Sequence, residues 1–323
     1  MRLRLVPSET KIDFFRYARV TFGFSILLVV FSLILEAVIG LNFGIDFRGG
    51  TTIRTQAETT IDVGDYRAAI SPLGLGDVTI TEVRDPTFGP TENVALLVIQ
   101  AQEGDEAVAT ATIDEVEAAL VALEPTLVFT SVESVGPTVS GELIWSAILA
   151  IALAIGAVLI YIWLRFEWQF SLGAVAALAH DVIVTVGVFS LLQIQFDLSI
   201  IAALLTIVGY SLNDTVVVFD RVRENLRRFK KKALRDVLNL SINETLSRTL
   251  MTSVTTLLAL LSLYILGGDV IRGFVFAMIW GVIIGTYSSI FVASNVLLFL
   301  GVKRDWSKPG EGPSGTQFAN IDA

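Results

Sequence analysis

Long apolar runs separated by short polar connections make up most of this chain. Six of these runs approach or exceed the roughly 20 apolar residues that an α-helix needs to cross a bilayer. They cover residues 20–40, 143–163, 171–192, 197–219, 249–268 and 273–301. The last run is long enough to require tilt or to begin as an interfacial helix. The pattern predicts an α-helical polytopic membrane protein with six transmembrane helices.

One sizeable polar region, residues 40–141, follows the first run. Its apolar periodicity predicts two helices and four strands in the order βαββαβ. The strands are expected at 51–56, 78–84, 93–101 and 127–133, and the helices at 62–73 and 105–123. This order is that of the ferredoxin-like α+β fold, which by itself implies no particular function.

Composition agrees with several membrane spans, since 53% of the 323 residues are hydrophobic, 17% are charged and the mean hydropathy is +0.69. Residues 40–141 hold 16 acidic and 4 basic residues, a balance of −12, while the rest of the chain balances to +3. Such an acidic domain argues against nucleic acid as a partner. The chain has no cysteine and one histidine, and it lacks a phosphate-binding glycine loop. We therefore expect no metal centre, no ATP and no other cofactor.

Basic residues predict the orientation. The segment 221–235 holds eight basic residues against one acid, and five more basic residues precede the first span. The positive-inside rule places both termini and a basic loop at 220–248 in the cytoplasm, and the polar domain on the opposite side. The predicted organisation is a cytoplasmic N-terminus (1–19), a first helix (20–40), a periplasmic domain (41–141), helices two to six (142–301) and a cytoplasmic tail (302–323).

Asn213 and Asp214 fall inside the fourth predicted span. A carboxylate at the centre of a transmembrane helix costs about 2.5–3.5 kcal/mol to insert, and such residues usually face a bundle interior and serve an ion or proton path. The alternative is an acid wetted by headgroups at the rim, a position that Asp220 fits better because it adjoins the charged segment. Asp214 is therefore the main functional candidate.

The fifth predicted span carries a polar stripe that includes Thr245, Arg248, Thr252 and Thr256. A stripe of this kind lines a wet path or supplies hydrogen bonds between helices. Arg248 favours the first interpretation, because it can neutralise Asp214 from the same half of the bundle. Its alternative role is to extend its charged end to the headgroups.

The third predicted span contains His180 and Asp181 near the middle of the membrane. A carboxylate beside an imidazole is a candidate proton relay. Adjacent residues point about 100° apart on a helix, however, and the pair equally suits a tie between helices.

Four stretches together resemble the SecF family, the smaller subunits of the SecD–SecF protein-export complex within the resistance-nodulation-division superfamily. The first is the glycine turn from Phe43 to Thr51, which contains Gly44, Asp46, Gly49 and Gly50. The second is Ala179-His180-Asp181, and the third runs from Gly209 to Asp214 and continues to Asn225. The fourth is Leu246-Ser247-Arg248-Thr249. The resemblance implies that Asp214 is the proton-carrying acid and Arg248 its charge partner. It also implies a SecD partner, the SecYEG channel with its associated subunits, and a bacterial plasma membrane.

Together with the residues above, the resemblance implies an accessory transporter that uses the proton motive force to assist export of unfolded polypeptides. Half of a proton-coupled small-molecule exporter is the alternative, although such a protein would prefer two large outer domains. A scaffold whose polar residues only hold helices together is a third hypothesis. An enzyme is least favoured, because no set of nucleophile, base and orienting group is readable.

Overall fold

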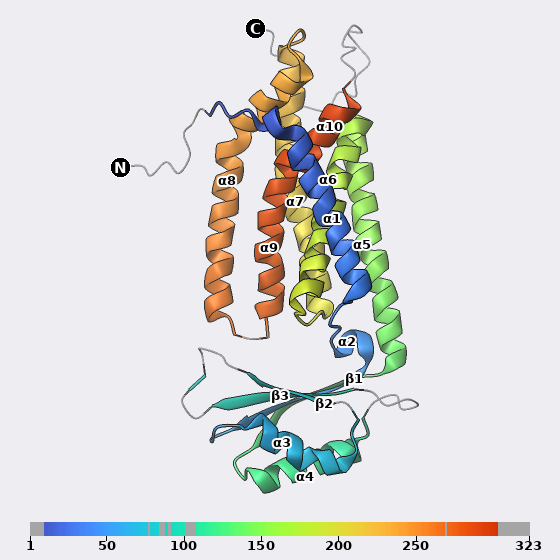
Figure 1. Cartoon of the computed structure of the whole chain (residues 1–323), viewed down its shortest axis with the longest axis vertical. Helices are drawn as coiled ribbons and strands as arrows, with labels where there is room; N and C mark the ends of the chain where they lie inside the picture. Colours follow the sequence, from blue (N-terminus) through green and yellow to red (C-terminus); the bar gives the residue numbers. More distant parts are fainter. Residues whose placement is uncertain are drawn as a thin grey trace, which may run out of the picture.

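The structure is a computed structural model of the chain, and it describes residues 10–76, 78–83, 88–89, 92–100, 108–268 and 270–302. Six helices in this part of the chain are long and apolar enough to cross a membrane, which confirms the six predicted spans. They form a bundle with a small domain at one end, and the first and last described residues lie at the other (Figure 1). We call these the domain end and the terminal end of the bundle. Residues 1–9 and most of the predicted tail, 303–323, lie outside the described residues.

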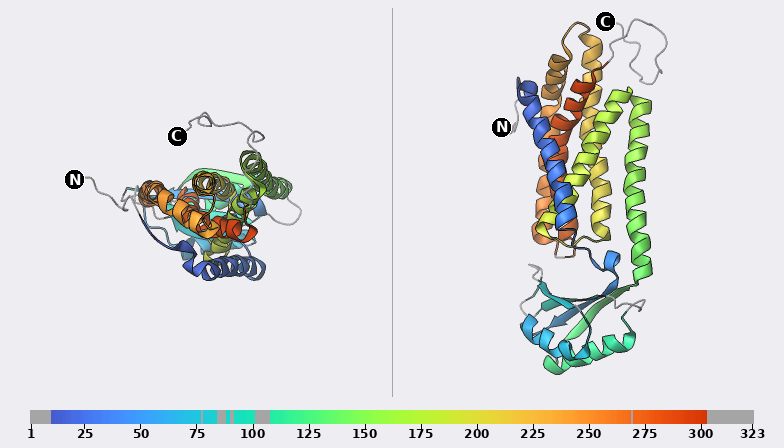
Figure 2. Two further views of the ribbon diagram at one scale, coloured as in Figure 1. Left: turned by 90° about the horizontal axis from the view of Figure 1, so that it is seen from above. Right: turned by 45° about the vertical axis from the view of Figure 1, so that its right-hand side comes forward.

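Three of the spanning helices are central and three are peripheral. The helices are α1 (Ala18–Val38), which follows the 3-10 turn η1 (Phe14–Tyr17), α5 (Pro137–Arg165), α6 (Trp168–Leu192), α7 (Leu198–Arg228), α8 (Leu234–Leu266) and α9 (Arg272–Ser288). The last span continues from α9 through a π-helical turn, η3 (Ser289–Ala293), into α10 (Ser294–Leu300). Helices α6, α7 and α9 are the most buried, whereas α1, α5 and α8 lie at the periphery (Figure 2).

The segment 220–248, expected to be a loop, is helical except at 229–233. Here α7 and α8 continue past the apolar runs as a hairpin, because their inward positions stay apolar while the basic residues face outward. Val222 and Leu226 of α7 pack with Val237 and Ile242 of α8, and all four are buried. The loop prediction is therefore wrong, because it rested on the charge of this segment and not on the helical spacing of its apolar residues.

The small domain has the predicted βαββαβ order and forms one antiparallel sheet with strand order β2-β3-β1-β4. Its elements are β1 (Gly50–Ala57), α3 (Val63–Ile70) with the turn η2 (Ser71–Leu73), β2 (Val78–Val83), β3 (Asn93–Gln100), α4 (Thr110–Leu123) and β4 (Val128–Val135). Helices α3 and α4 cover the sheet face that points away from the bundle (Figure 1). Ile53, Leu97 and Leu120 form the centre of its core. The ferredoxin-like prediction is confirmed.

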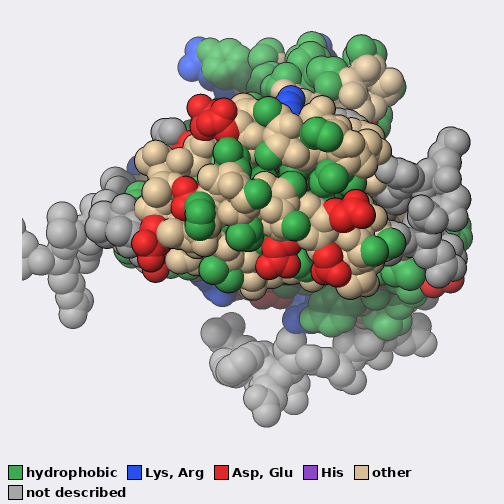
Figure 3. Space-filling view, turned by 90° about the horizontal axis from the view of Figure 1, so that it is seen from below, with side chains coloured by type: hydrophobic (Ala, Val, Ile, Leu, Met, Phe, Trp, Pro, Cys, Tyr) green, Lys and Arg blue, Asp and Glu red, His purple; other side chains and the backbone are tan. Residues whose placement is uncertain are grey.

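Acidic side chains are spread over the far face of the domain (Figure 3). Asp114, Glu115 and Glu117 of α4 are exposed there. The face shows carboxylates among apolar and neutral side chains and few basic ones.

A short helix, α2 (Ile45–Arg48), lies between the bundle and the sheet on the path from α1 to β1. The return path runs from β4 directly into α5. The two connections leave the sheet side by side, because Gly50 at the start of β1 pairs with Val135 at the end of β4.

Candidate functional site

Asp214 lies in α7 on the face that packs against α9. Its side chain is 4% exposed, and its Oδ2 atom is buried without a hydrogen-bond partner in the described part of the chain. Ile207 and Ser211 precede it at spacings of four and three residues, so the three side chains share one face of the helix. The structure therefore confirms the burial that the sequence implied.

Glycines in α9 bring that helix close to the Asp214 face. A Cβ atom added at Gly281 would overlap the side chain of Ile207, and one added at Gly285 would come within 3.1 Å of Ser211 Cβ. Small residues at a helix interface allow such close approach in membranes. Asp214 is consequently enclosed by packed helices.

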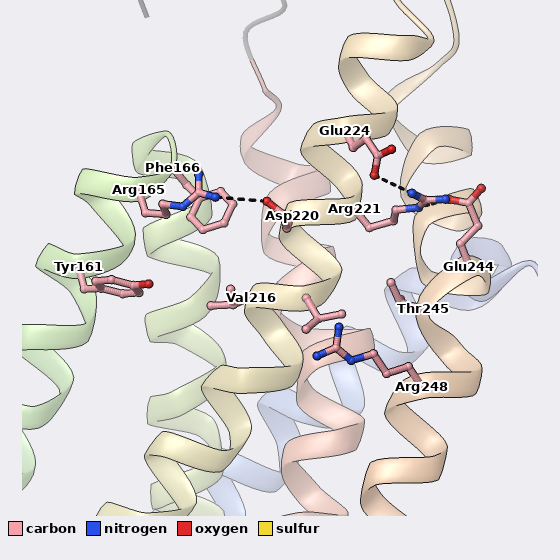
Figure 4. A pocket seen from close by; sticks show the side chains of 11 residues that line it. Tyr161, Arg165, Phe166, Val216, Asp220, Arg221, Glu224, Glu244, Thr245 and Arg248 are labelled. Carbon is pink, nitrogen blue, oxygen red and sulfur yellow. Dashed lines mark hydrogen bonds and ion pairs between the residues drawn. The ribbon is translucent and has the colours of Figure 1, made fainter. Parts of the chain in front are cut away.

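Arg248 of α8 is exposed and lines a cavity of about 530 Å³ toward the terminal end of the bundle (Figure 4). The cavity is formed by α5, α7 and α8, and its lining residues are Tyr161, Arg165, Phe166, Val216, Val217, Asp220, Arg221, Glu224, Glu244, Thr245 and Arg248. Arg165 lies 3.7 Å from Asp220, while Arg221 pairs with Glu224 at 2.6 Å and with Glu244 at 2.7 Å. Among the arginines of this lining, Arg248 alone makes no ion pair with a described residue.

Among the described residues, no hydrogen bond and no ion pair within 4.0 Å joins Asp214 to Arg248, its predicted charge partner. Arg248 lines the cavity together with Val217, which lies three residues from Asp214 on α7. The two groups thus lie on neighbouring helices as a separated pair.

Asp181 of α6 is fully buried and accepts hydrogen bonds from three elements. Ser211 Oγ of α7 and Ser288 Oγ of α9 each donate to Oδ2 at 2.7 Å, and His180 Nδ1 lies 3.0 Å from Oδ1. Nε2 of His180 is buried without a described partner, and its ring lies 6.2 Å from that of Tyr287. The arrangement ties α6, α7 and α9 together, as one of the two sequence interpretations had it.

Asn213 is exposed on the outside of α7, so it and Asp214 point to different surroundings. Thr206 and Gly209 precede it at spacings that place them on the same outward stripe, and both are exposed. This stripe is polar or small within an otherwise apolar span.

The glycine turn lies against the start of α7. Gly44 N donates to Phe196 O at 2.9 Å, and Leu198 N donates to Asp46 Oδ2 at 2.9 Å. Gly49 and Gly50 have φ angles of +75° and +131°, a region that glycine enters without strain. The turn into the domain therefore requires glycine at two positions, and its aspartate contacts a spanning helix.

Sequence reasoning missed Ser211 and Ser288 as partners of Asp181. Buried serines within apolar helices are the only signal that the sequence offered, and it does not say which carboxylate they reach.

Comparison with known proteins identifies the family. A profile described as protein export membrane protein SecD/SecF, C-terminal, matches residues 115–303, and one described as the SecD/SecF GG motif matches residues 37–61. The protein translocase subunit SecF of Cereibacter sphaeroides is 60% identical over 322 residues, with 100% of this chain and 99% of that protein covered. The chain belongs to the SecD/SecF family. It is accordingly a multi-pass membrane protein of a transport family and not an enzyme.

A more distant SecF sequence and two solved SecDF structures are also similar to this chain. The protein translocase subunit SecF of Rickettsia bellii is 41% identical over 303 residues, covering 94% of this chain and 97% of that protein. A crystal structure of SecDF, a translocon-associated membrane protein from Thermus thermophilus, matches with a TM-score of 0.81 and 34% identity over 93% of this chain. SecDF in a super-membrane-facing form matches with a TM-score of 0.67 and 37% identity over 92% of this chain. This chain spans about 40% of the first of these SecDF chains and 39% of the second.

Proposed function

We propose that this chain is a subunit of the Sec protein translocase that uses the proton motive force to assist export of unfolded polypeptides. The observation that carries the proposal is the buried carboxyl oxygen of Asp214, which lies within a membrane span and has no hydrogen-bond partner among the described residues. A carboxylate isolated from water is costly, and it becomes tolerable when it is protonated or faces a positive charge. Asp214 with Arg248 nearby therefore has two accessible charge states.

The cavity beside Arg248 supports a route for protons from the terminal end. It reaches Val217, which lies one helical turn, roughly 4.5 Å along the axis, from Asp214. The remaining distance between the cavity and Asp214 is bridged by a small movement of the helices or by a partner subunit. Movement of one charge across 100 mV supplies about 2.3 kcal/mol, enough to shift helix packing.

A SecD subunit is the proposed partner on the exposed stripe of α7. Thr206, Gly209 and Asn213 suit close contact and hydrogen bonding with another helix better than contact with lipid. The matched SecDF chains are more than twice as long as this one, which supports a second half of similar design. Transporters built from repeated halves place their ion sites at the interface between them.

The proposed orientation places the terminal end in the cytoplasm and the small domain in the periplasm of a bacterial plasma membrane. The basic residues of the α7–α8 hairpin support it through the positive-inside rule. In that orientation the domain meets polypeptides that emerge from a neighbouring SecYEG channel, and the lipid bilayer surrounds the peripheral helices.

Export into vesicles with an imposed proton gradient tests the proposal. Asp214→Asn should abolish the response to the gradient while membrane insertion and assembly are retained, since the change is nearly isosteric. Asp236→Asn is a matched control, because Asp236 is an exposed acid in the first turn of α8, outside the apolar part of the span. A full gradient response from Asp214→Asn would show that the carboxyl is structural.

A further inference from the structure

We propose that Asp46 is a positioning residue that couples α7, the helix of Asp214, to the small domain; the inference rests on the proposed proton-coupled function. Asp46 lies in α2, immediately before the domain. Its Oδ2 accepts a hydrogen bond of 2.9 Å from the backbone N–H of Leu198, the first residue of α7, across 152 residues of sequence. Movement of α7 therefore reaches the segment that enters the domain.

The hydrogen bond is a second cap on α7. The first N–H groups of a helix have no partner within the helix, and the partial positive charge there favours carboxylates. Asp197 satisfies one such group, because its Oδ1 accepts from Ile200 N at 3.2 Å. Asp46, from a different part of the chain, satisfies the N–H group of Leu198. The first turn of α7 is therefore capped by two carboxylates.

Backbone contacts strengthen this link. Phe196 N donates to Asn42 O at 2.8 Å, and Gly44 N donates to Phe196 O at 2.9 Å. The rings of Phe43 and Phe196 meet edge to face with centroids 6.1 Å apart. The segment before α2 therefore lies along the start of α7 as a short parallel bridge and moves with it.

Helix α2 is attached to the bundle more firmly than to the sheet. Phe47 is buried in one apolar cluster with Ala147 of α5 and Phe196, and Ser140 Oγ of α5 donates to Ile45 O at 3.4 Å. Toward the domain, the chain passes through Gly49 and Gly50, both at positive φ. The chain therefore enters the domain through this glycine pair, and Asp46 lies just on its bundle side.

The consequence is a mechanical connection over a long distance. Leu198 and Asp214 are sixteen residues apart on one continuous helix, roughly 24 Å along its axis. A shift or rotation of α7 that follows a change in the charge of Asp214 carries Leu198 with it. Through Asp46 the same movement reaches Gly50, where the inner strand β1 begins.

Spin labels can measure this coupling in the full complex, because the chain has no native cysteine. Glu117→Cys on α4 and Ile265→Cys at the domain end of α8 are both exposed. Pulsed dipolar spectroscopy in lipid nanodiscs should show that Asp214→Asn shifts the distance distribution when Asp46 is present. Asp46→Ala should remove this shift and the gradient-driven part of export, whereas Asp46→Asn should keep both, since asparagine caps as well as aspartate.

A second variant breaks the same hydrogen bond from the donor side. Leu198→Pro removes the N–H, and proline is well tolerated at the first position of a helix. It should reproduce the loss seen with Asp46→Ala even if that variant accumulates poorly. Asp62→Ala is the matched control: Asp62 caps α3 within the domain, where its Oδ1 accepts from Gly64 N at 2.7 Å, and its loss should leave the shift and the gradient response unchanged.

The outcomes separate the two proposals. If Asp214→Asn shifts the labels equally with and without the Asp46 contact, or Asp46→Ala on its own keeps the gradient response of export, coupling through Asp46 is wrong while the proton-coupled function stands. If Asp214→Asn changes neither readout in the otherwise native chain, both proposals fall.

Discussion

Asp181 and Asp214 are both buried carboxylates on central helices, yet their surroundings differ. Asp181 is held by the hydroxyls of Ser211 and Ser288 and by the imidazole of His180. Asp214 lies one helical turn from Ser211 but leaves its Oδ2 without a described partner. Two acids of the same kind and similar burial are therefore built to do different things.

The difference lies in the hydrogen bonds that each carboxylate makes. Loss of the Asp181 carboxylate would break the hydrogen bonds that join α6 to α7 and α9. At Asp214 the buried oxygen has no described partner, and an unsatisfied buried polar group costs about 1–3 kcal/mol. Asp181 is thus a tie between helices, whereas the buried oxygen of Asp214 makes no hydrogen bond to a described residue.

The largest effect that tests this contrast is expected from Asp181→Ala. It leaves two serine hydroxyls and an imidazole without their acceptor, and removal of one member of a buried charged network costs about 3–5 kcal/mol. Unfolding in mixed detergent should show this loss, and Asp181→Asn, which keeps one acceptor oxygen, should lose less. A loss below about 1 kcal/mol would place Asp181 in the same class as Asp214.

Packing between α7 and α9 gives the next effect. Gly281→Ala forces a methyl group into the side chain of Ile207, and overpacking of this kind costs about 1–3 kcal/mol. Gly209→Ala is the control, because its Cβ would meet nothing within 4 Å. Equal unfolding midpoints for the two variants would mean that the helices are not in close contact.

An alkaline titration tests the stability of the small domain through Tyr66, a buried ionisable group outside the bundle. Burial, with a smaller contribution from the Glu124 carboxylate, raises the pKa of Tyr66 from 10.0 to about 12. Because the folded-state pKa lies above the unfolded one, domain stability is full below pH 10 and falls by at most about 1.4 kcal/mol per pH unit as the pH rises toward 12. Hydrogen exchange of the β1 and β3 amides should report the loss, and Tyr66→Phe should remove this contribution.

The smallest change in stability is expected at Asp214 itself. Asp214→Asn replaces a carboxylate whose Oδ2 has no hydrogen-bond partner among the described residues, so the free energy of unfolding should stay within about 1 kcal/mol of the native value. Under identical conditions, Asp214→Asn should lower the free energy of unfolding less than Asp181→Asn does. A larger loss at Asp214 than at Asp181 would reverse the comparison.

The elements of the fold were readable from the sequence because their signals are local. Apolar runs of spanning length gave six helices, and alternating or helical periodicity gave the βαββαβ domain. The hairpin beyond the fourth span was missed because its basic residues concealed the spacing of Val222, Leu226 and Val237, which pack together only when both helices are present.

The candidate site was readable only in part. An acid within an apolar run singles out Asp214 and Asp181 without a structure. Which donors reach each carboxylate depends on how three helices are rotated about their axes, and no local pattern encodes that rotation. The Asp46 contact is harder still, since it joins a turn and a helix start 152 residues apart.

The pairing of Gly50 with Val135 has a geometric consequence of its own. Both connections of the domain enter at one corner of the sheet, so the domain is joined to the bundle through one narrow neck. An eight-residue strand such as β1 extends about 27 Å from that neck. A rotation of about 10° about that corner would displace the far end of the strand by roughly 5 Å over that length.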